Sequence, residues 1–214
     1  MQDTGANTHY LYKKGWRGLL LDGGHFNESL NLHTAWIDPI TIVSVFDRHQ
    51  VPLELDYLSI DIDSADLWIF RSVVSSGRYR PRVISVEYNC NYPLESTIAN
   101  IGGEYTWYSD KIYGAALLSL KMVGDEFGYS LVDVVPYLDV IFIRNDLLNG
   151  SKIPEFEYWR PLTSRPHHLP NQRSEDEIGK YLVDYQEWIR NGQNFAAASG
   201  DVVFDQIRRL NIQL

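Results

Sequence analysis

Three short apolar segments, each ending in acidic or polar residues, constrain the fold of this chain more than any other feature. They are residues 18–22 (GLLLD), 55–63 (LDYLSIDID) and 82–89 (RVISVEYN). A short apolar run that ends in a polar turn is typical of a strand buried in a parallel sheet. Apolar residues at helical spacing over 65–74 separate the last two segments, which predicts a strand–helix–strand unit with a right-handed crossover.

Further helices and a hairpin complete the α/β pattern predicted for residues 1–149. Helical spacing also occurs in residues 7–14, 39–51 and 116–127. Residues 129–135 and 140–144 are predicted strands, and their link is so short that only an antiparallel hairpin can connect them. Residues 24–38 contain no convincing strand, and residues 90–112 are expected to form a loop of a length typical of functional loops. We therefore expect a mostly parallel, doubly wound sheet with one antiparallel strand at its end.

Residues 150–214 are predicted to form a separate part of the chain. Four prolines mark an irregular connection, at positions 154, 161, 166 and 170. Ser174 and Glu177 form a capping box, which opens a helix expected to run through Trp188. A second helix is expected near residues 202–210. We interpret this part as a proline-rich connection followed by a helical appendage that packs on the α/β domain or on a partner.

The composition of the chain argues against some classes of partner and favours one cellular location. The chain has 19 Lys and Arg against 28 Asp and Glu, a net charge of -9, and no basic patch, which argues against a nucleic-acid partner. No apolar run approaches the ~20 residues of a membrane-spanning helix. The only cysteine, Cys90, permits no intrachain disulfide, and we interpret it as a buried residue rather than a nucleophile. These features favour a cytoplasmic protein.

Acidic and polar side chains follow all of the predicted parallel strands. They are Asp22, Asp61, Asp63, Glu87 and Asn89. Ligands of open parallel sheets bind outside the carboxyl ends of the strands, where these residues are expected to meet. A single acid at such a position often only caps the next helix, and Asp63 is well placed to do so. The conjunction of the acids nevertheless predicts a binding or active site at this edge.

Several short patterns, in this order along the chain, resemble the FkbM-like S-adenosylmethionine-dependent methyltransferases. Residues 7–23 resemble the second-strand region of that family, 58–63 the fourth strand and 82–89 the fifth strand. Tyr113-Gly114-Ala115 and residues 128–132 resemble the segment that leads into the sixth strand, and residues 141–146 the closing reversed strand. The resemblance covers roughly residues 5–146 and implies a Rossmann-like fold.

The resemblance also implies S-adenosylmethionine as the cofactor and a role for each site residue. Asp22 would accept hydrogen bonds from the ribose hydroxyls of the cofactor. The whole cofactor-binding set would be Gly5, Asn7, Asp22, Gly23 and Asp61. Asp63 or Glu87 would take the proton of the acceptor, and the sequence does not select between them. Asn89 and Tyr113 would line the pocket for the acceptor, a small-molecule, sugar or lipid hydroxyl.

The sequence departs from this family at the amino terminus, where no strand and glycine-rich loop precede Gly5. We therefore expect a first strand to be missing from the sheet, and an unpaired edge left in this way would favour homo-oligomers. A catalytically silent binding or scaffold module remains an alternative, as does a nucleotide-sugar or dinucleotide enzyme. A divalent cation held by Asp61, Asp63 and Glu87 also remains open.

Four further side chains are candidates for contact with a ligand. His25 follows the Asp22-Gly23-Gly24 turn and could contact a cofactor, whereas the other histidines are expected at the surface. Trp107, Tyr108 and Tyr113 flank the predicted long loop and could either cover a ligand or serve packing alone.

Overall fold

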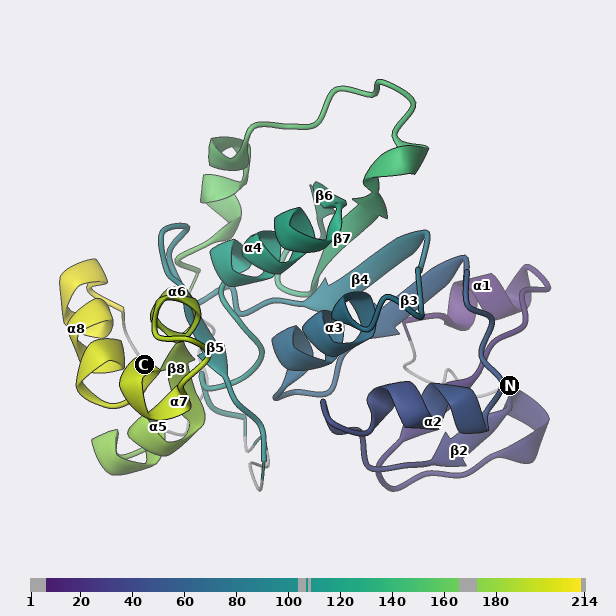
Figure 1. The fold of residues 1–214 in the computed structure, drawn as a ribbon, viewed down its shortest axis with the longest axis horizontal. Coiled ribbons are helices and arrows are strands. Elements are labelled where there is room, and N and C mark those ends of the chain that lie inside the picture. Colours follow the sequence, from purple (N-terminus) through teal and green to yellow (C-terminus); the bar gives the residue numbers. More distant parts are fainter. Residues whose placement is uncertain (1–6, 104–106, 108, 166–172, 213–214) are drawn as a thin grey trace.

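The chain folds into a mixed α/β structure with three small sheets and helices packed around them (Figure 1). The computed structural model describes residues 7–103, 107, 109–165 and 173–212. The largest sheet has four strands in the order β3-β4-β7-β6 and occupies the middle of the molecule. Within the described ranges, no helix combines the length and the apolar character needed to span a membrane.

The central sheet contains the strands that the sequence predicts most clearly. They are β3 (Tyr57–Ile60), β4 (Val83–Glu87), β6 (Tyr129–Val134) and β7 (Asp139–Arg144). β3 and β4 are parallel, and β7 is antiparallel to both of its neighbours, β4 and β6. The reversed strand therefore lies inside the sheet, whereas the sequence predicted it at the end. The hairpin connects β6 to β7, and β7 turns back between β6 and β4, so only the pair β3–β4 in this sheet is parallel.

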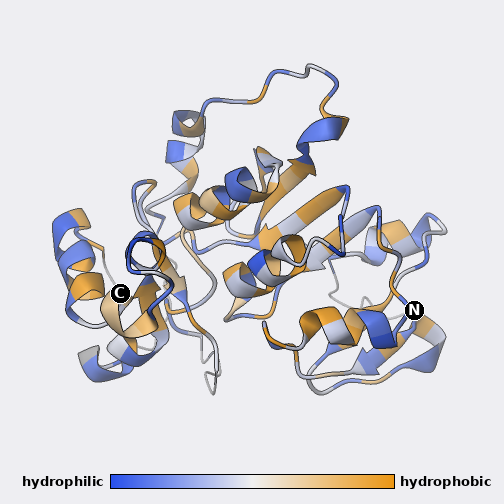
Figure 2. Cartoon of the chain, viewed as in Figure 1, coloured by the Kyte–Doolittle hydropathy of each residue, from blue (hydrophilic) through white to orange (hydrophobic). Residues whose placement is uncertain are grey.

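Two helices pack side by side over the central sheet, α3 (Asp66–Ser75) and α4 (Leu117–Phe127) (Figure 1). Gly124 explains how closely α4 approaches β7. A Cβ at that position would lie 2.7 Å from the ring of Phe142, so only glycine fits without a shift. Gly128 ends α4 in the left-handed conformation at φ 80°, directly after the helical spacing predicted for residues 116–127. Figure 2 shows the apolar character of the central strands that these helices cover.

The amino-terminal elements lie beside the central sheet, and α2 (Ile42–Arg48) packs on α3 within the main core. In chain order they are α1 (His9–Lys13), β1 (Leu20–Asp22), η1 (Glu28–Leu30), β2 (Leu32–Thr34) and α2. β1 and β2 pair in parallel as a separate two-stranded sheet. β2 corrects the prediction that residues 24–38 contain no strand. The tripeptide Leu-His-Thr shows neither an apolar run nor a clear alternation, so its pattern could not indicate a strand.

The carboxyl-terminal elements differ most from the prediction. They are η2 (Asn145–Leu147), η3 (Phe156–Leu162), α5 (Glu175–Tyr181), β8 (Leu182–Asp184), α6 (Tyr185–Arg190), α7 (Phe195–Ala198) and α8 (Asp201–Leu210). The helix expected to run through Trp188 is interrupted by β8, which pairs antiparallel with β5 (Ile98–Asn100). β5 lies within residues 90–112, which were predicted to be a loop. Asp184 explains the interruption, because its carboxylate caps the backbone N–H groups of Gln186 and Glu187 and starts a new helix.

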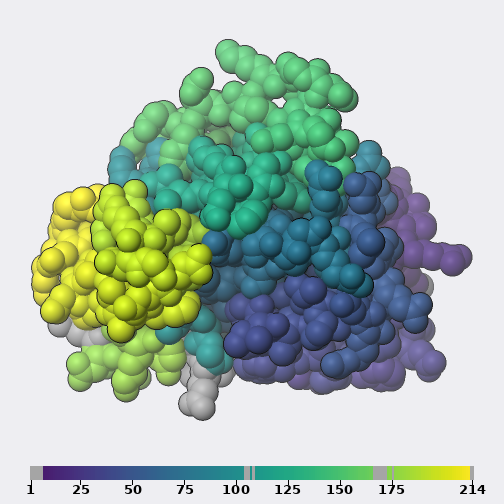
Figure 3. Space-filling view, in the orientation of Figure 1, coloured from purple at the N-terminus to yellow at the C-terminus, as the bar shows by residue number. Residues whose placement is uncertain are grey.

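The residues after 150 pack on the α/β domain through a buried aromatic cluster. The ring of Trp68 on α3 lies 5.6 Å from Tyr185 and 4.8 Å from Trp188, measured between ring centroids. Gln206 of α8 accepts hydrogen bonds from Ser96 Oγ and Thr97 N, both at 2.8 Å. Figure 3 shows the yellow carboxyl-terminal segment lying directly against the blue and teal parts of the domain. The predicted capping box of Ser174 and Glu177 is present at the start of α5.

Candidate functional site

The central sheet brings together the three acids that the sequence places after its two parallel strands. Asp61 follows β3, Asp63 lies in the turn between β3 and α3, and Glu87 ends β4. One carboxylate oxygen from each of these residues lies within 4.8 Å of the other two. Asp61 and Asp63 are exposed at the edge of the sheet, and Glu87 is half-buried behind them. This carboxylate cluster of Asp61, Asp63 and Glu87 is the candidate site.

The turn between β3 and α3 fixes the two exposed acids of the cluster. Asp66 holds this turn, because its carboxylate accepts hydrogen bonds from the backbone N–H groups of Ile62 at 2.8 Å and Ser64 at 3.0 Å. Asp63 adopts a left-handed φ of 57°, which aspartate and asparagine tolerate better than most residues. Asp63 is therefore not the helix cap that its position suggested. The N-cap of α3 is Ala65, and the carboxylate that bonds the backbone N–H groups of the turn is that of Asp66.

A fourth carboxylate, that of Asp139, lies beside the cluster. Asp139 is the direct antiparallel partner of Glu87 in the pairing of β4 with β7, so the two side chains leave the same face of the sheet. The side-chain amide of Asn7 donates to Asp61 Oδ2 at 3.0 Å and to Asp139 Oδ2 at 3.5 Å, which links the two acids. Sequence reasoning missed Asp139, because only the observed position of β7 inside the sheet places it next to β4.

The pKa values of these carboxyls are raised by burial and by their mutual repulsion. Burial, followed by the charges of Asp66, Asp61, Asp63 and Asp139, raises the pKa of Glu87 well above its usual range. Burial and the charge of Asp61 raise the pKa of Asp139 to about 6. The surrounding protein and the charge of Asp61 raise the pKa of Asp63 as well. The region thus lacks enough positive charge to balance its acids.

Asp22 does not belong to the cluster, because it lies at the end of β1 in the β1–β2 sheet. Its Oδ1 atom accepts hydrogen bonds from the backbone N–H of Gly24 at 2.7 Å and of His25 at 2.8 Å, and it lies 2.8 Å from His25 Nδ1. The bond from Gly24, followed by that from the His25 ring, lowers the pKa of Asp22, which stays ionised. Gly23 in the same turn lies against the ring of Trp36. Gly5, also predicted to contact the cofactor, lies outside the described residues.

Asn89 and Tyr113, the predicted acceptor-binding residues, are both buried. The side-chain amide of Asn89 donates to the carbonyl groups of Lys111 at 2.8 Å and Tyr113 at 2.9 Å, and its oxygen accepts from Asn91 N at 3.0 Å. Asn89 thus holds the segment around Tyr113 against the end of β4, close to Glu87. The Tyr113 hydroxyl lies 3.8 Å from Cys90 Sγ, and its ring packs on Trp107. Tyr108 is outside the described residues.

Cys90 is fully buried, as the sequence interpretation expected. Burial is the main cause that raises the pKa of its thiol, so Cys90 is held in the protonated, less nucleophilic form.

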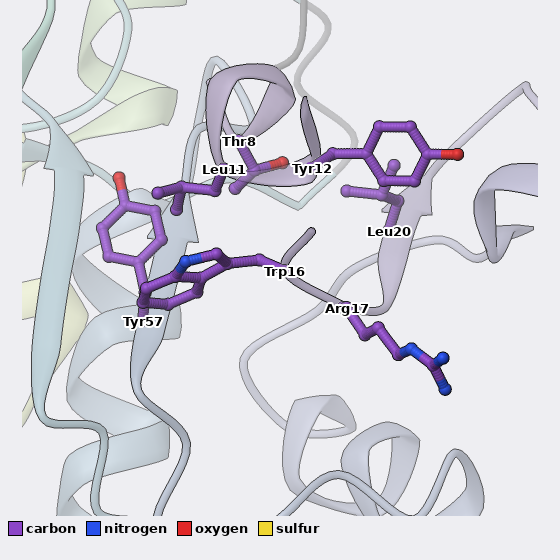
Figure 4. A pocket seen from close by; sticks show the side chains of 8 residues that line it. Thr8, Leu11, Tyr12, Trp16, Arg17, Leu20 and Tyr57 are labelled. Carbon is purple, nitrogen blue, oxygen red and sulfur yellow. The ribbon is translucent and has the colours of Figure 1, made fainter. Parts of the chain in front are cut away.

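A small hollow that sequence reasoning did not predict lies between α1, β1 and β3 (Figure 4). Its volume is about 80 Å³. The residues that line it are Thr8, Leu11, Tyr12, Trp16, Arg17, Gly18, Leu20 and Tyr57. Figure 4 shows the rings of Trp16 and Tyr57 among the side chains that line it. Pockets for drug-sized ligands measure roughly 300–1,000 Å³, so this hollow alone does not hold a nucleoside.

Comparison of the chain with protein-family models gives no match. Comparison with curated proteins and with solved structures gives no match either.

Proposed function

We propose that this chain is an S-adenosylmethionine-dependent methyltransferase domain with a Rossmann-like, doubly wound fold, which transfers a methyl group to a small-molecule, sugar or lipid hydroxyl. The observation that carries the proposal is the gathering of Asp61, Asp63 and Glu87 at the carboxyl ends of β3 and β4. Ligands of open α/β sheets bind at this edge. The strands that resemble the fourth, fifth, sixth and reversed strands of the FkbM-like family also lie in one sheet, which supports the proposal.

The residues predicted to bind the cofactor have side chains that suit a nucleoside. Asp22 ends a parallel strand and stays ionised, which suits a carboxylate that accepts hydrogen bonds from two ribose hydroxyls. Asn7 and Asp61 are joined by a hydrogen bond of 3.0 Å and would extend the same contact surface toward the cluster. Gly5 and Gly23 would allow the backbone to approach the ligand closely. S-adenosylmethionine would supply an activated methyl group on a sulfonium.

Methyl transfer requires alignment of the acceptor and removal of its proton. Asp63 is the better placed base, because it is exposed at the edge of the sheet, whereas Glu87 is half-buried behind it. Asn89 and Tyr113 would act on the acceptor side by holding the segment that packs against the end of β4.

Calorimetric titration with S-adenosylhomocysteine tests this proposal directly. We expect saturable binding, and we expect Asp22→Asn to weaken it about 10- to 100-fold, because a charge-assisted hydrogen bond contributes about 1.5–3 kcal/mol. The exposed Glu155→Gln serves as the matched control and should bind as the wild type does. Absence of binding by this chain, and by a version extended upstream by a strand and a loop, would exclude the proposal.

A catalytically silent binding or scaffold module is the second candidate. The elements after Ser174, α5, β8, α6, α7 and α8, favour it, because they add a packed surface to the α/β domain that methyl transfer does not require. The same titration separates the candidates, since a scaffold would show no heat with S-adenosylhomocysteine. Binding of a dinucleotide or a sugar nucleotide without S-adenosylhomocysteine would instead support a different α/β enzyme.

A further inference from the structure

The spacing of the carboxylate cluster is close to the spacing of ligands around one divalent cation. Oxygen ligands lie about 2.3–2.6 Å from Ca²⁺ and about 2.0–2.1 Å from Mg²⁺, so two ligands of the same ion are separated by at most twice those distances. That limit is about 4.6–5.2 Å for Ca²⁺. The oxygens of Asp61, Asp63 and Glu87 lie within 4.8 Å of one another, which is close to this limit, so binding of Ca²⁺ would need only a small inward rotation of the two exposed side chains.

Asp139 provides a second, independent indication of a missing positive charge. Its side chain is only 4 % exposed, and its Oδ1 atom is buried without a hydrogen-bond partner in the part of the chain that the structure describes. Glu87 Oε2, on the residue directly opposite, is buried and unpartnered in the same way. A buried carboxylate oxygen with no donor or cation is costly, so such atoms are rare unless something binds them.

Protein groups do not supply this charge. Among the described residues, no ion pair with Lys, Arg or His involves Asp61, Asp63, Glu87 or Asp139. The neutral amide of Asn7 is the donor that reaches Asp61 and Asp139. Glu87 and Asp139 lie on the paired strands β4 and β7, so repulsion cannot move their backbones apart.

We propose that Asp61, Asp63 and Glu87 bind one oxygen-seeking divalent cation, with Ca²⁺ fitting the present spacing best, and that Asp139 completes the site as the fourth carboxylate. Hard cations of this class prefer several carboxylate oxygens and accept water at the remaining positions. The proposal does not depend on methyltransferase activity, because a scaffold module could bind the same ion. In the cation-bound protein, Asp63 and Glu87 are ligands of the ion, so neither is then free to act as the base of the proposed methyl transfer.

Titration of the chelator-treated protein with Ca²⁺, Mg²⁺ and Mn²⁺ tests the proposal, with heat and the thermal unfolding midpoint as readouts. We expect one Ca²⁺ per chain, a raised midpoint, and a loss of affinity of about tenfold or more in Asp63→Asn and in Glu87→Gln, because affinity follows the charge of the ligands. Asp63→Asn leaves the backbone undisturbed, since asparagine also tolerates the left-handed φ of 57°. Glu155→Gln is the matched control and should retain full affinity.

Two results would overturn the cation site. One is the absence of saturable heat and of a midpoint shift with all three ions. The other is an equal response in wild type, Asp63→Asn, Glu87→Gln and Glu155→Gln, which would show binding at unrelated surface acids. A parallel titration with S-adenosylhomocysteine separates this proposal from the proposed function. Cofactor binding without cation binding removes only the cation site, and cation binding without cofactor binding supports the site on its own.

Discussion

The central sheet and the β1–β2 sheet are built from similar apolar sequences, but their residues are buried to very different extents. Ile84, Val86 and Phe142 of the central sheet are fully buried. In contrast, every residue of β1 is only half-buried, and β2 contains no buried residue. β1 has one strand as its neighbour, whereas β4 has a strand on each side and the helix α3 packed on it. An apolar run therefore predicts a strand, but the neighbours of that strand decide how much stability it contributes.

This difference divides the proposed site into a rigid half and a lightly supported half. The carboxylate cluster is attached to the packed central sheet, while Asp22 is attached to the β1–β2 pair. We expect the acids after β3 and β4 to keep their positions without a ligand. The turn at Asp22 depends more on its own hydrogen bonds, which come from the adjacent Gly24 and His25.

The largest effect should come from truncating matched apolar residues in the two sheets. Phe142→Ala should lower the free energy of unfolding by about 3–5 kcal/mol, because Phe142 is fully buried and packs on Phe70 with 5.1 Å between ring centroids. Leu21→Ala in β1 should lower it by less than about 2 kcal/mol, because the side chain is half-buried. Urea unfolding of both variants measures the difference. Equal losses would mean that the two sheets are equally well supported.

The pH dependence of stability should locate the uncompensated acids on the central sheet. The pKa of Asp139 is raised to about 6 in the folded chain, so folding favours its protonated form. The free energy of unfolding should therefore fall as the pH rises from about 4 to about 6, by on the order of 2–3 kcal/mol for this group. Asp139→Asn should flatten that decline. Urea unfolding in chelator at several pH values measures it, and an unchanged slope would contradict the assignment.

Replacing two helical glycines by alanine should change the stability by smaller amounts and in opposite directions. Gly124→Ala should destabilise the fold by about 1–3 kcal/mol, because the new Cβ would lie 2.7 Å from the Phe142 ring at the packed sheet. Gly179→Ala in α5 should stabilise it by about 0.5–1 kcal/mol, since its nearest neighbour would be Phe204 at 3.6 Å. Thermal unfolding of the pair provides the comparison. Stabilisation by both substitutions would show that α4 can move away from β7.

The sequence predicted the central strands and the meeting of Asp61, Asp63 and Glu87, because parallel strands place their carboxyl ends at one edge. It could not predict Asp139, whose place beside Glu87 depends on the insertion of β7 between β4 and β6. β5 and β8 are three-residue strands stabilised by pairing with each other, and Ile98 meets Asp184 far along the chain, so local pattern could not reveal them. Asn89 likewise looked available for a ligand, and its partners at Lys111 and Tyr113 are visible only in the folded chain.

The pairing of β5 with β8 determines when this protein can complete its fold during synthesis. Trp68 emerges from the ribosome early, and its ring is covered by Tyr185, Trp188 and Phe195, which are made more than a hundred residues later. Until then the nascent chain exposes an indole and an unpaired strand edge, both of which favour association with other chains. A premature stop before residue 182 should therefore yield an aggregation-prone product, even though every strand of the central sheet has already been translated.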